Sequence, residues 1–296
     1  RQARGRGRGR EPAARWVGTG CAAEPGREAS AARPEVDGLV GKAAKRDPRA
    51  WNLPETAPPA PKHRTRAFVA VQNGCDHACT FCVIPQGRGA SRSLTIAEVL
   101  REVERHLMEG APEIVLTGVD VTSWGHDLPD RPPLGALVQA ILEGFPDLAR
   151  LRMSSLDGIE IDPLLFELFA SEKRLMPHLH LSLQHGHDLI LKRMKRRHSR
   201  AQAVKLVSDL RARRPDLAVG ADLIAGFPTE SDAHHEANLS SVRDLQIVHC
   251  HVFPYSPRDN TPAARMPQVD RAIVKARAAE LRAVAAATQA EWLATL

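Results

Sequence analysis

The sequence predicts an α/β protein built around six parallel strands. From about residue 65 onward, short apolar runs rich in β-branched residues alternate with longer runs of helical period. A polar or glycine-rich segment follows each short run. This alternation is typical of βα units, in which helices cover a parallel sheet. Because six strands are fewer than the eight that close a barrel, we expect an open partial barrel or a doubly wound sheet.

The start of the chain differs in composition from the rest. Gly, Arg, Ala and Pro are frequent over residues 1–50, where periodicity is weak. Residues 51–64 contain four prolines, which lack a backbone donor and favour extended conformations, so this stretch is predicted to be a linker. The predicted organisation is an N-terminal part over 1–50, the linker, a main domain over 65–285, and a terminal helical segment over 286–296.

The expected elements of the main domain follow in chain order. In parallel sheets the chemistry lies in the loops beyond the carboxyl ends of the strands, so the polar segments after the six strands are expected to form one site. Strands are predicted at 67–72, 113–119, 149–155, 178–184, 218–227 and 248–256, and helices at 95–110, 134–145, 162–172, 200–214, 231–245 and 270–296.

Charge and cysteine content narrow the class of protein. Lys and Arg exceed Asp and Glu by 41 to 35, a formal net charge of +6, and basic residues cluster at 191–200 and 211–214. This excess permits a nucleic-acid partner without demonstrating one. Five cysteines, three of them crowded together, fit metal ligation in a reducing compartment better than a disulfide framework. With no apolar run of membrane-spanning length, we expect a soluble cytoplasmic protein and no membrane partner.

Three cysteines, Cys75, Cys79 and Cys82, lie within eight positions of the loop after the first predicted strand. A zinc site needs four ligands, and His77, between the first two cysteines, is the nearby candidate for the fourth. A disulfide would leave one thiol over, and three inert buried thiols are a further alternative. A 4Fe–4S cluster with three thiolate ligands would keep one iron open for a substrate or cofactor.

The spacing C-x3-C-x2-C within "NGCDHACTFCVIPQGRGASRS" resembles the signature of radical S-adenosylmethionine (SAM) enzymes, whose members carry a partial or full βα barrel. The longer segment, with "VLTGVDVTSWG", "HLHLSLQHGHDLILKRMKRRHSR" and "ADLIAGFPTE", resembles the methylthiotransferases of that superfamily. "GRGASRS" and "LTGVDV" are most similar to the branch that acts on threonylcarbamoyladenosine in tRNA. The isopentenyladenosine and ribosomal-protein aspartate branches remain alternatives, as does a zinc-stabilised RNA-binding module without catalysis.

The resemblance implies two 4Fe–4S clusters and SAM as cofactors. The first cluster would bind SAM through its open iron, and the resulting 5′-deoxyadenosyl radical would take hydrogen from C2 of the adenine at position 37. A second cluster would supply sulfur, and Cys21 resembles its last ligand, although its two expected partners are absent. The resemblance thus implies a chain shortened at both ends, in which residues 1–50 are a remnant of the N-terminal methylthiotransferase domain and the family's C-terminal RNA-binding β-barrel is absent. Expected partners are the tRNA anticodon loop and a flavodoxin or ferredoxin donor, with the protein a monomer.

The resemblance also suggests roles for individual residues, each of which could equally be an ordinary loop or strand residue. Arg193, Lys195, Arg196 and Arg197 would serve the SAM carboxylate or tRNA phosphates. Tyr255 and Trp124 are available for stacking on bases. The remaining expected contacts are with the SAM amino group for Gly118 and Asp120, ribose for Ser155, Asp157 and Gln184, and adenine for Ile224 and Gly226.

Overall fold

The computed structural model describes residues 17–19, 27–34, 36–41, 44, 48–51 and 65–296. The chain divides into two compact units, one of residues 1–60 with 83–89, the other of residues 61–82 with 90–296. Cys21 and nearly all of the predicted linker lie outside the described residues. In the first unit β1 (Val17–Gly18) pairs in parallel with β2 (Gly38–Leu39). Its helical segments are α2 (Arg27–Ala31), a 3-10 turn at Pro48–Trp51, and α3 (Ile84–Arg88).

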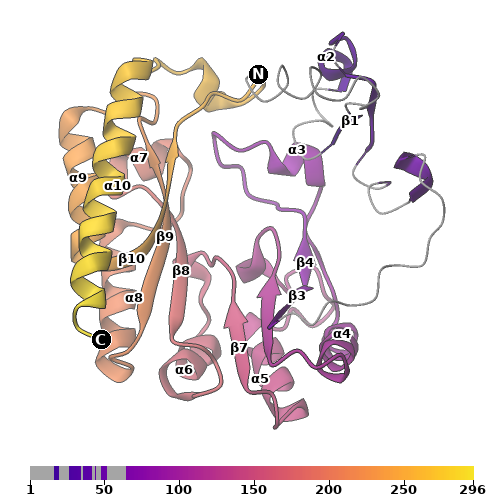
Figure 1. Ribbon diagram of the computed structural model, residues 1–296. Coiled ribbons are helices and arrows are strands. Elements are labelled where there is room, and N and C mark those ends of the chain that lie inside the picture. The colour runs from indigo at the N-terminus through magenta and orange to yellow at the C-terminus, as the bar shows by residue number, and fades with distance from the viewer. Residues whose placement is uncertain (1–16, 20–26, 35, 42–43, 45–47, 52–64) are drawn as a thin grey trace. The chain divides into compact units, whose positions relative to one another are not determined.

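The second unit contains the six predicted parallel strands (Figure 1). Two three-stranded sheets, β3-β6-β7 and β8-β9-β10, are joined by a parallel bridge between Leu156 and Leu181. The strands thus follow one another in chain order, without the reversal that defines a doubly wound sheet, and the partial barrel is confirmed. Their bounds are β3 Arg66–Ala70, β6 Glu113–Thr117, β7 Arg150–Met153, β8 His178–Gln184, β9 Ala218–Ala225 and β10 Ile247–Pro254.

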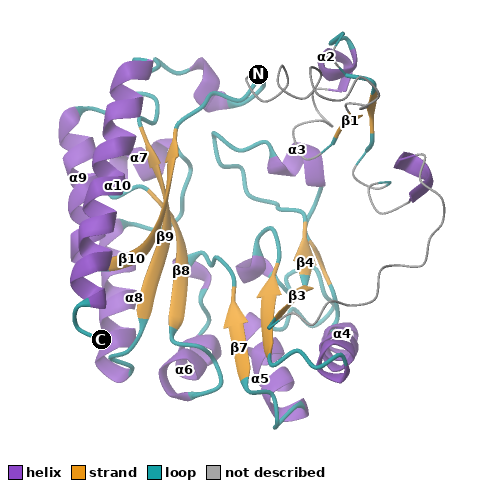
Figure 2. Cartoon of the chain, viewed as in Figure 1, coloured by secondary structure: helices purple, strands orange, loops and turns teal. Residues whose placement is uncertain are grey.

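The six predicted helices are also present in this unit (Figure 2). They are α4 (Ile96–Met108), α5 (Leu134–Gly144), α6 (Pro163–Ser171), α8 (Arg200–Arg213), α9 (Asp232–Asp244) and α10 (Arg271–Leu293). The limit placed at residue 285 falls inside α10, which continues without a break. Short elements absent from the prediction are α7 (Asp188–Arg193) and an antiparallel pair, β4 (Gln72–Asn73) with β5 (Arg92–Ser93).

The two faces of the strands differ in chemistry because side chains alternate along a strand. On β8, Leu179, Leu181 and Leu183 are buried in the main hydrophobic core, as are Val219 and Leu223 of β9. Helix α10 packs against β10 on this outer side (Figure 1). The inner face is more polar, so polar chemistry is available inside the partial barrel and at the ends of its strands.

A second, smaller hydrophobic cluster lies beside the cysteine loop. Its members are the buried Ile190, Met194, Ile224, Phe227 and Ala263, with Phe81 packed against them. Across residues 65–296 and the other described stretches, no helix combines the length and the apolar character needed to cross a membrane.

Candidate active site

The cysteine loop follows β4 and is anchored to the segment after β8. The backbone turns at Gly74, whose φ of 82° lies in the left-handed region open to glycine. The Thr80 hydroxyl donates to the carbonyl of Arg193 (2.8 Å), and the Thr80 amide donates to the carbonyl of Met194 (3.1 Å). Cys75, Cys79 and Cys82 are partly exposed, and none of the three is in a disulfide. The loop is therefore fixed at its centre while its thiols stay accessible.

Asp120, after β6, lies next to the first cysteine. Its Oδ2 is 3.6 Å from the sulfur of Cys75, 2.8 Å from Nε2 of His77, and accepts a hydrogen bond from the Ser123 hydroxyl (2.8 Å). Two amides, those of Val119 and Asp120, donate to the side-chain oxygen of Gln72 at 3.0 and 2.9 Å. Gln72 thus ties the loop after β6 to the strand that leads into the cysteines.

Arg196 connects the second cysteine to the loop after β7. Its guanidinium group lies 2.8 Å from Oδ2 of Asp157, 2.9 Å from the carbonyl of Ser182 and 3.7 Å from the sulfur of Cys79. The side chains of Arg196 and Asp157 are 9% and 5% exposed, so the ion pair is buried. Loops after four strands, β3, β6, β7 and β8, consequently meet around the thiols, as expected for the carboxyl ends of parallel strands.

Ionisation at this site depends on these contacts. Burial raises the pKa of the Cys75 thiol to about 12, and the neighbouring Asp120 carboxylate adds to the increase. Hydrogen bonds with Asp120 and Glu160 raise the pKa of His77 to about 10, so His77 is protonated at neutral pH. Burial opposes ionisation of Asp120, but the hydrogen bonds from His77 and Ser123 hold its pKa below the usual value. A thiolate at Cys75 therefore requires a compensating positive charge, which a bound metal provides.

A second buried polar network lies at the end of β9. Glu230 is fully buried and accepts hydrogen bonds from the amide of Gly226 (3.0 Å) and the guanidinium of Arg277 (3.0 Å). Nε2 of His185, after β8, is 3.1 Å from Oε2 of Glu230, the same oxygen that accepts from the Gly226 amide. Asn238 accepts from the amide of Gly186 (3.0 Å). These contacts fix the loops after β8 and β9.

The structure places the other residues singled out in the sequence as follows. Gly226 has a φ of 74°, and a Cβ there would come within 2.5 Å of Val274, so the fold itself requires glycine. Ile224 belongs to the smaller hydrophobic cluster next to Phe81.

Gln184 adopts a φ of 66° at the end of β8, and Ser155 is half-buried just beyond β7. Gly118 packs against Gln72, and Arg193 donates to the Thr229 hydroxyl (2.6 Å).

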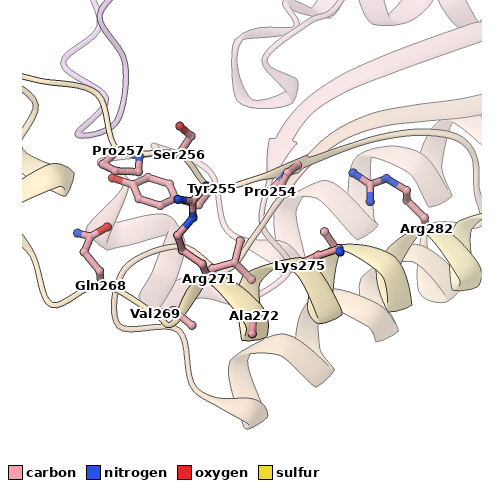
Figure 3. A pocket seen from close by; sticks show the side chains of 12 residues that line it. Pro254, Tyr255, Ser256, Pro257, Gln268, Val269, Arg271, Ala272, Lys275 and Arg282 are labelled. Carbon is pink, nitrogen blue, oxygen red and sulfur yellow. The ribbon is translucent and has the colours of Figure 1, made fainter. Parts of the chain in front are cut away.

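Trp124 does not lie where a base could stack on it. Its side chain is completely buried, and its indole nitrogen donates to the carbonyl of Leu94 (2.8 Å). The expectation of a stacking role was wrong because Trp124 follows a polar loop in sequence yet turns into the core. Tyr255, by contrast, lines an open pocket together with Pro254, Gln268, Arg271, Lys275 and Arg282 (Figure 3).

Several residues that shape the site escaped the sequence analysis. Gln72 and Glu160 were assigned no role, yet Gln72 holds the loop after β6, and Glu160 lies 2.7 Å from Arg197. Glu230, the last residue of "ADLIAGFPTE", has no predicted role either, yet it joins the loops after β8 and β9. A polar residue at the very end of a predicted strand, such as Gln72, is the signal that could have pointed to one of them.

Comparison with known proteins agrees with this architecture. A family profile described as the radical SAM superfamily matches residues 69–241, more than half of the chain. The threonylcarbamoyladenosine tRNA methylthiotransferase MtaB of Rickettsia prowazekii is 51% identical over 219 residues, which cover 74% of this chain and 52% of the relative. The tRNA-2-methylthio-N(6)-dimethylallyladenosine synthase of Paracoccus denitrificans is 37% identical over 78% of this chain and 52% of its own length. The chain thus spans about half the length of these curated relatives.

Solved structures resemble the fold at low sequence identity. The radical SAM methyltransferase TsrM from Kitasatospora setae superposes with a TM-score of 0.54 at 18% identity, covering 67% of this chain and 38% of that one. SuiB from Streptococcus suis gives a TM-score of 0.51 at 15% identity, covering 74% and 47%. Six parallel strands in chain order, a three-cysteine loop after the first of them and a family match over 69–241 together show that this chain belongs to the radical SAM superfamily.

Proposed function

We propose that this chain is the catalytic part of a tRNA methylthiotransferase that adds a methylthio group to C2 of N6-threonylcarbamoyladenosine at position 37. The observation that carries the proposal is the loop of Cys75, Cys79 and Cys82, placed at the carboxyl ends of the barrel strands within the matched region. The choice of substrate is supported by the 51% identity to a relative whose name states that nucleoside. The reaction would use the anticodon loop of tRNA, a flavodoxin or ferredoxin as reductant, and a monomeric enzyme.

The donor set fits a 4Fe–4S cluster better than a single zinc ion. Among the described residues, the groups whose ligand atoms all lie within 4.8 Å of one another include Cys75 with His77 and Asp120, but not the three cysteines together. The three thiols are therefore spread more widely than the ligands of one ion. Such a spread is suited to a larger iron–sulfur cluster. Cys75, Cys79 and Cys82 would hold it, and when bound it would supply the one-electron chemistry that cleaves SAM.

The chain's own residues would orient the reactants and exclude water. Arg196, held by Asp157, keeps a fixed positive charge beside Cys79, where it would favour a thiolate. Nε of Arg196 is buried and makes no hydrogen bond within the protein, which leaves it available to a polar group of a bound cofactor. The apolar side chains of Phe81, Ile224 and Phe227 would keep water from the adjacent surface.

The pocket beside Tyr255 supports contact with RNA. Its volume is about 940 Å³, and Arg271, Lys275 and Arg282 contribute positive charges along α10 (Figure 3). Phosphates would meet these cations, while the Tyr255 ring offers a surface for stacking. Reversing the charge at Arg271 and Lys275 should weaken tRNA binding and reduce its salt dependence.

Complementation tests the proposal directly. A strain lacking 2-methylthio-N6-threonylcarbamoyladenosine should regain it when given the gene that contains this chain, as seen by mass spectrometry of tRNA nucleosides. The Cys79→Ala variant should not restore the modification. Formation of the methylthiolated isopentenyladenosine product instead would assign the enzyme to the isopentenyladenosine branch. A colourless, zinc-loaded protein that does not cleave SAM would overturn the assignment.

A further inference from the structure

The inner face of β8, β9 and β10 carries a cluster of imidazoles and one carboxylate that the proposed reaction does not use. On each strand the residues of this face alternate with the core residues of the outer face. His180 comes from β8, Asp222 from β9 and His251 from β10. Their neighbours Leu181, Leu223 and Val252 pack in or against the core instead. Three neighbouring strands therefore direct polar side chains to one place.

The register between neighbouring strands determines which of these side chains face one another. His180 pairs with Gly220, which is also the partner of His249, and Asp222 pairs with His251. A Cβ on Gly220 would lie 2.4 Å from Nδ1 of His180, so the missing side chain is what lets the imidazole lie across β9. The ring of His180 then comes within 5.0 Å of the ring of His251, measured between centroids. Glycine at 220 thus makes room for this arrangement.

The distances match those between ligands of one metal ion. Oδ1 of Asp222 is 3.1 Å from Nε2 of His180 and 2.9 Å from Nδ1 of His251, and all three atoms lie within 4.8 Å of one another. Two ligands at about 2.1 Å from an ion and about 90–110° apart are separated by roughly 3.0–3.4 Å. A small outward movement of three side chains would accommodate the ion.

A third imidazole lies beside these residues and could take part in the site. The ring centroid of His249 is 4.8 Å from that of His251. His251 is half exposed and Asp222 is 21% exposed, so ions can enter from solvent.

We propose that His180, Asp222 and His251 bind one divalent transition-metal ion of the zinc class, with His249 close enough to complete the site. Two imidazoles and a carboxylate suit Zn²⁺, Co²⁺ or Fe²⁺ rather than Ca²⁺ or Mg²⁺, which prefer oxygen ligands. The proposed site contains no cysteine and is separate from Cys75, Cys79 and Cys82, the proposed ligands of the iron–sulfur cluster.

Titration with Co²⁺ of a variant that lacks the three cysteines of the loop tests this site. Untagged chain carrying Cys75→Ser, Cys79→Ser and Cys82→Ser is titrated with Co²⁺ and followed by visible absorption and calorimetry. One Co²⁺ per chain should bind, without a thiolate charge-transfer band, and Zn²⁺ should displace it. Asp222→Asn or His251→Ala should each weaken binding at least ~10-fold. His126→Ala, at an exposed histidine on a loop, is the matched control and should bind as its parent.

A second arm uses the protein with its loop intact. Cluster-loaded wild-type chain exposed to Zn²⁺ and then desalted should retain one zinc in addition to its iron, and Asp222→Asn should retain none. Circular dichroism checks that each variant is folded. Binding that is absent, that shows thiolate bands from Cys250, or that persists unchanged in Asp222→Asn and His251→Ala would mean that the three residues form only a hydrogen-bonded cluster.

Discussion

At the scale of single residues, the buried ion pair of Glu230 and Arg277 joins the loop after β9 to α10. Glu230 has no solvent exposure, and Arg277 is 7% exposed at the side chain. A buried ion pair is not a strong source of net stability, because desolvation offsets much of the attraction. Removing one member, however, leaves the other charge uncompensated. The pair therefore acts as a constraint on the loops it joins.

We expect Arg277→Ala to lower the free energy of unfolding by about 3–5 kcal/mol, because it leaves the buried Glu230 with only imidazoles as side-chain partners, His185 at 3.1 Å and His235 at 3.9 Å. Urea unfolding followed by circular dichroism measures the effect. Adding Glu230→Gln should recover part of the loss. The matched control is Arg243→Ala, since Arg243 pairs with Glu236 on the surface, and its expected cost is below about 1 kcal/mol. Equal losses in the two variants would contradict the role assigned to burial.

The cysteine loop allows a second prediction at this scale. Cys79→Ala should abolish the brown colour of anaerobically reconstituted protein and its cleavage of SAM, because two thiolates hold a cluster poorly. Iron content, absorption spectrum and release of 5′-deoxyadenosine measure the outcome. Cys250→Ala should keep both properties, since Cys250 packs against the hydrophobic core away from the loop. Retention of a full cluster in Cys79→Ala would remove Cys79 from the ligand set.

At the scale of elements, the junction between β9 and α10 depends on one glycine. Gly226 combines a left-handed φ with direct packing against Val274 of α10. Its amide also donates to Glu230, which α10 reaches through Arg277. A strand end, a loop and a long helix thus share one close contact, so the position of α10 and the shape of the site are coupled.

Gly226→Ala should destabilise the protein more than Gly110→Ala. Both positions have a left-handed φ, 74° and 83°, but a Cβ at Gly110 would meet no atom within 4 Å. The difference between the two losses therefore reports the contact with Val274 alone. Thermal unfolding of the two variants measures it, and Val274→Ala in the Gly226→Ala background should recover part of it. Identical losses would show that backbone strain alone sets the cost.

At the scale of the whole molecule, acidification should reduce stability. Burial lowers the pKa of His185, so the folded state holds it neutral, and this contribution is present above pH 6.5 and lost below it. Burial opposes ionisation of Glu230, but His185 and Arg277 hold its pKa below 4.5, so its contribution is lost as the pH falls below that value. Both groups therefore lower the free energy of unfolding as the pH falls.

We expect the free energy of unfolding to fall between pH 6.5 and 4, with a slope of at most about 1.4 kcal/mol per pH unit for each group. Urea unfolding at a series of pH values measures this slope. His185→Gln, which retains a polar group, should flatten the curve near pH 6 and leave the lower part. An unchanged curve in that variant would assign the pH dependence to other groups.

The sequence was most informative where structure depends on local pattern. The six strands and six helices appear close to their predicted positions, because apolar periodicity directly reports which face of an element is buried. Sequence order alone also predicted that the loops after β3, β6, β7 and β8 would meet. Exact partners could not be predicted in this way. Arg196 and Arg197 are neighbours in one basic run, yet one is buried against Asp157 and the other is 47% exposed.

The sequence by itself determined the strand and helix pattern, the spacing of Cys75, Cys79 and Cys82, and, through the family resemblance of the segment around them, the expected class of chemistry. Only the tertiary structure decided that Trp124 belongs to the core, that Gln72 and Arg196 hold the loops around the thiols, and that His180, Asp222 and His251 meet on one face. The physical reason is the separation in sequence between the residues that interact. Periodicity and spacing arise from contacts between near neighbours in sequence, whereas strand register and burial bring together residues that lie tens of positions apart.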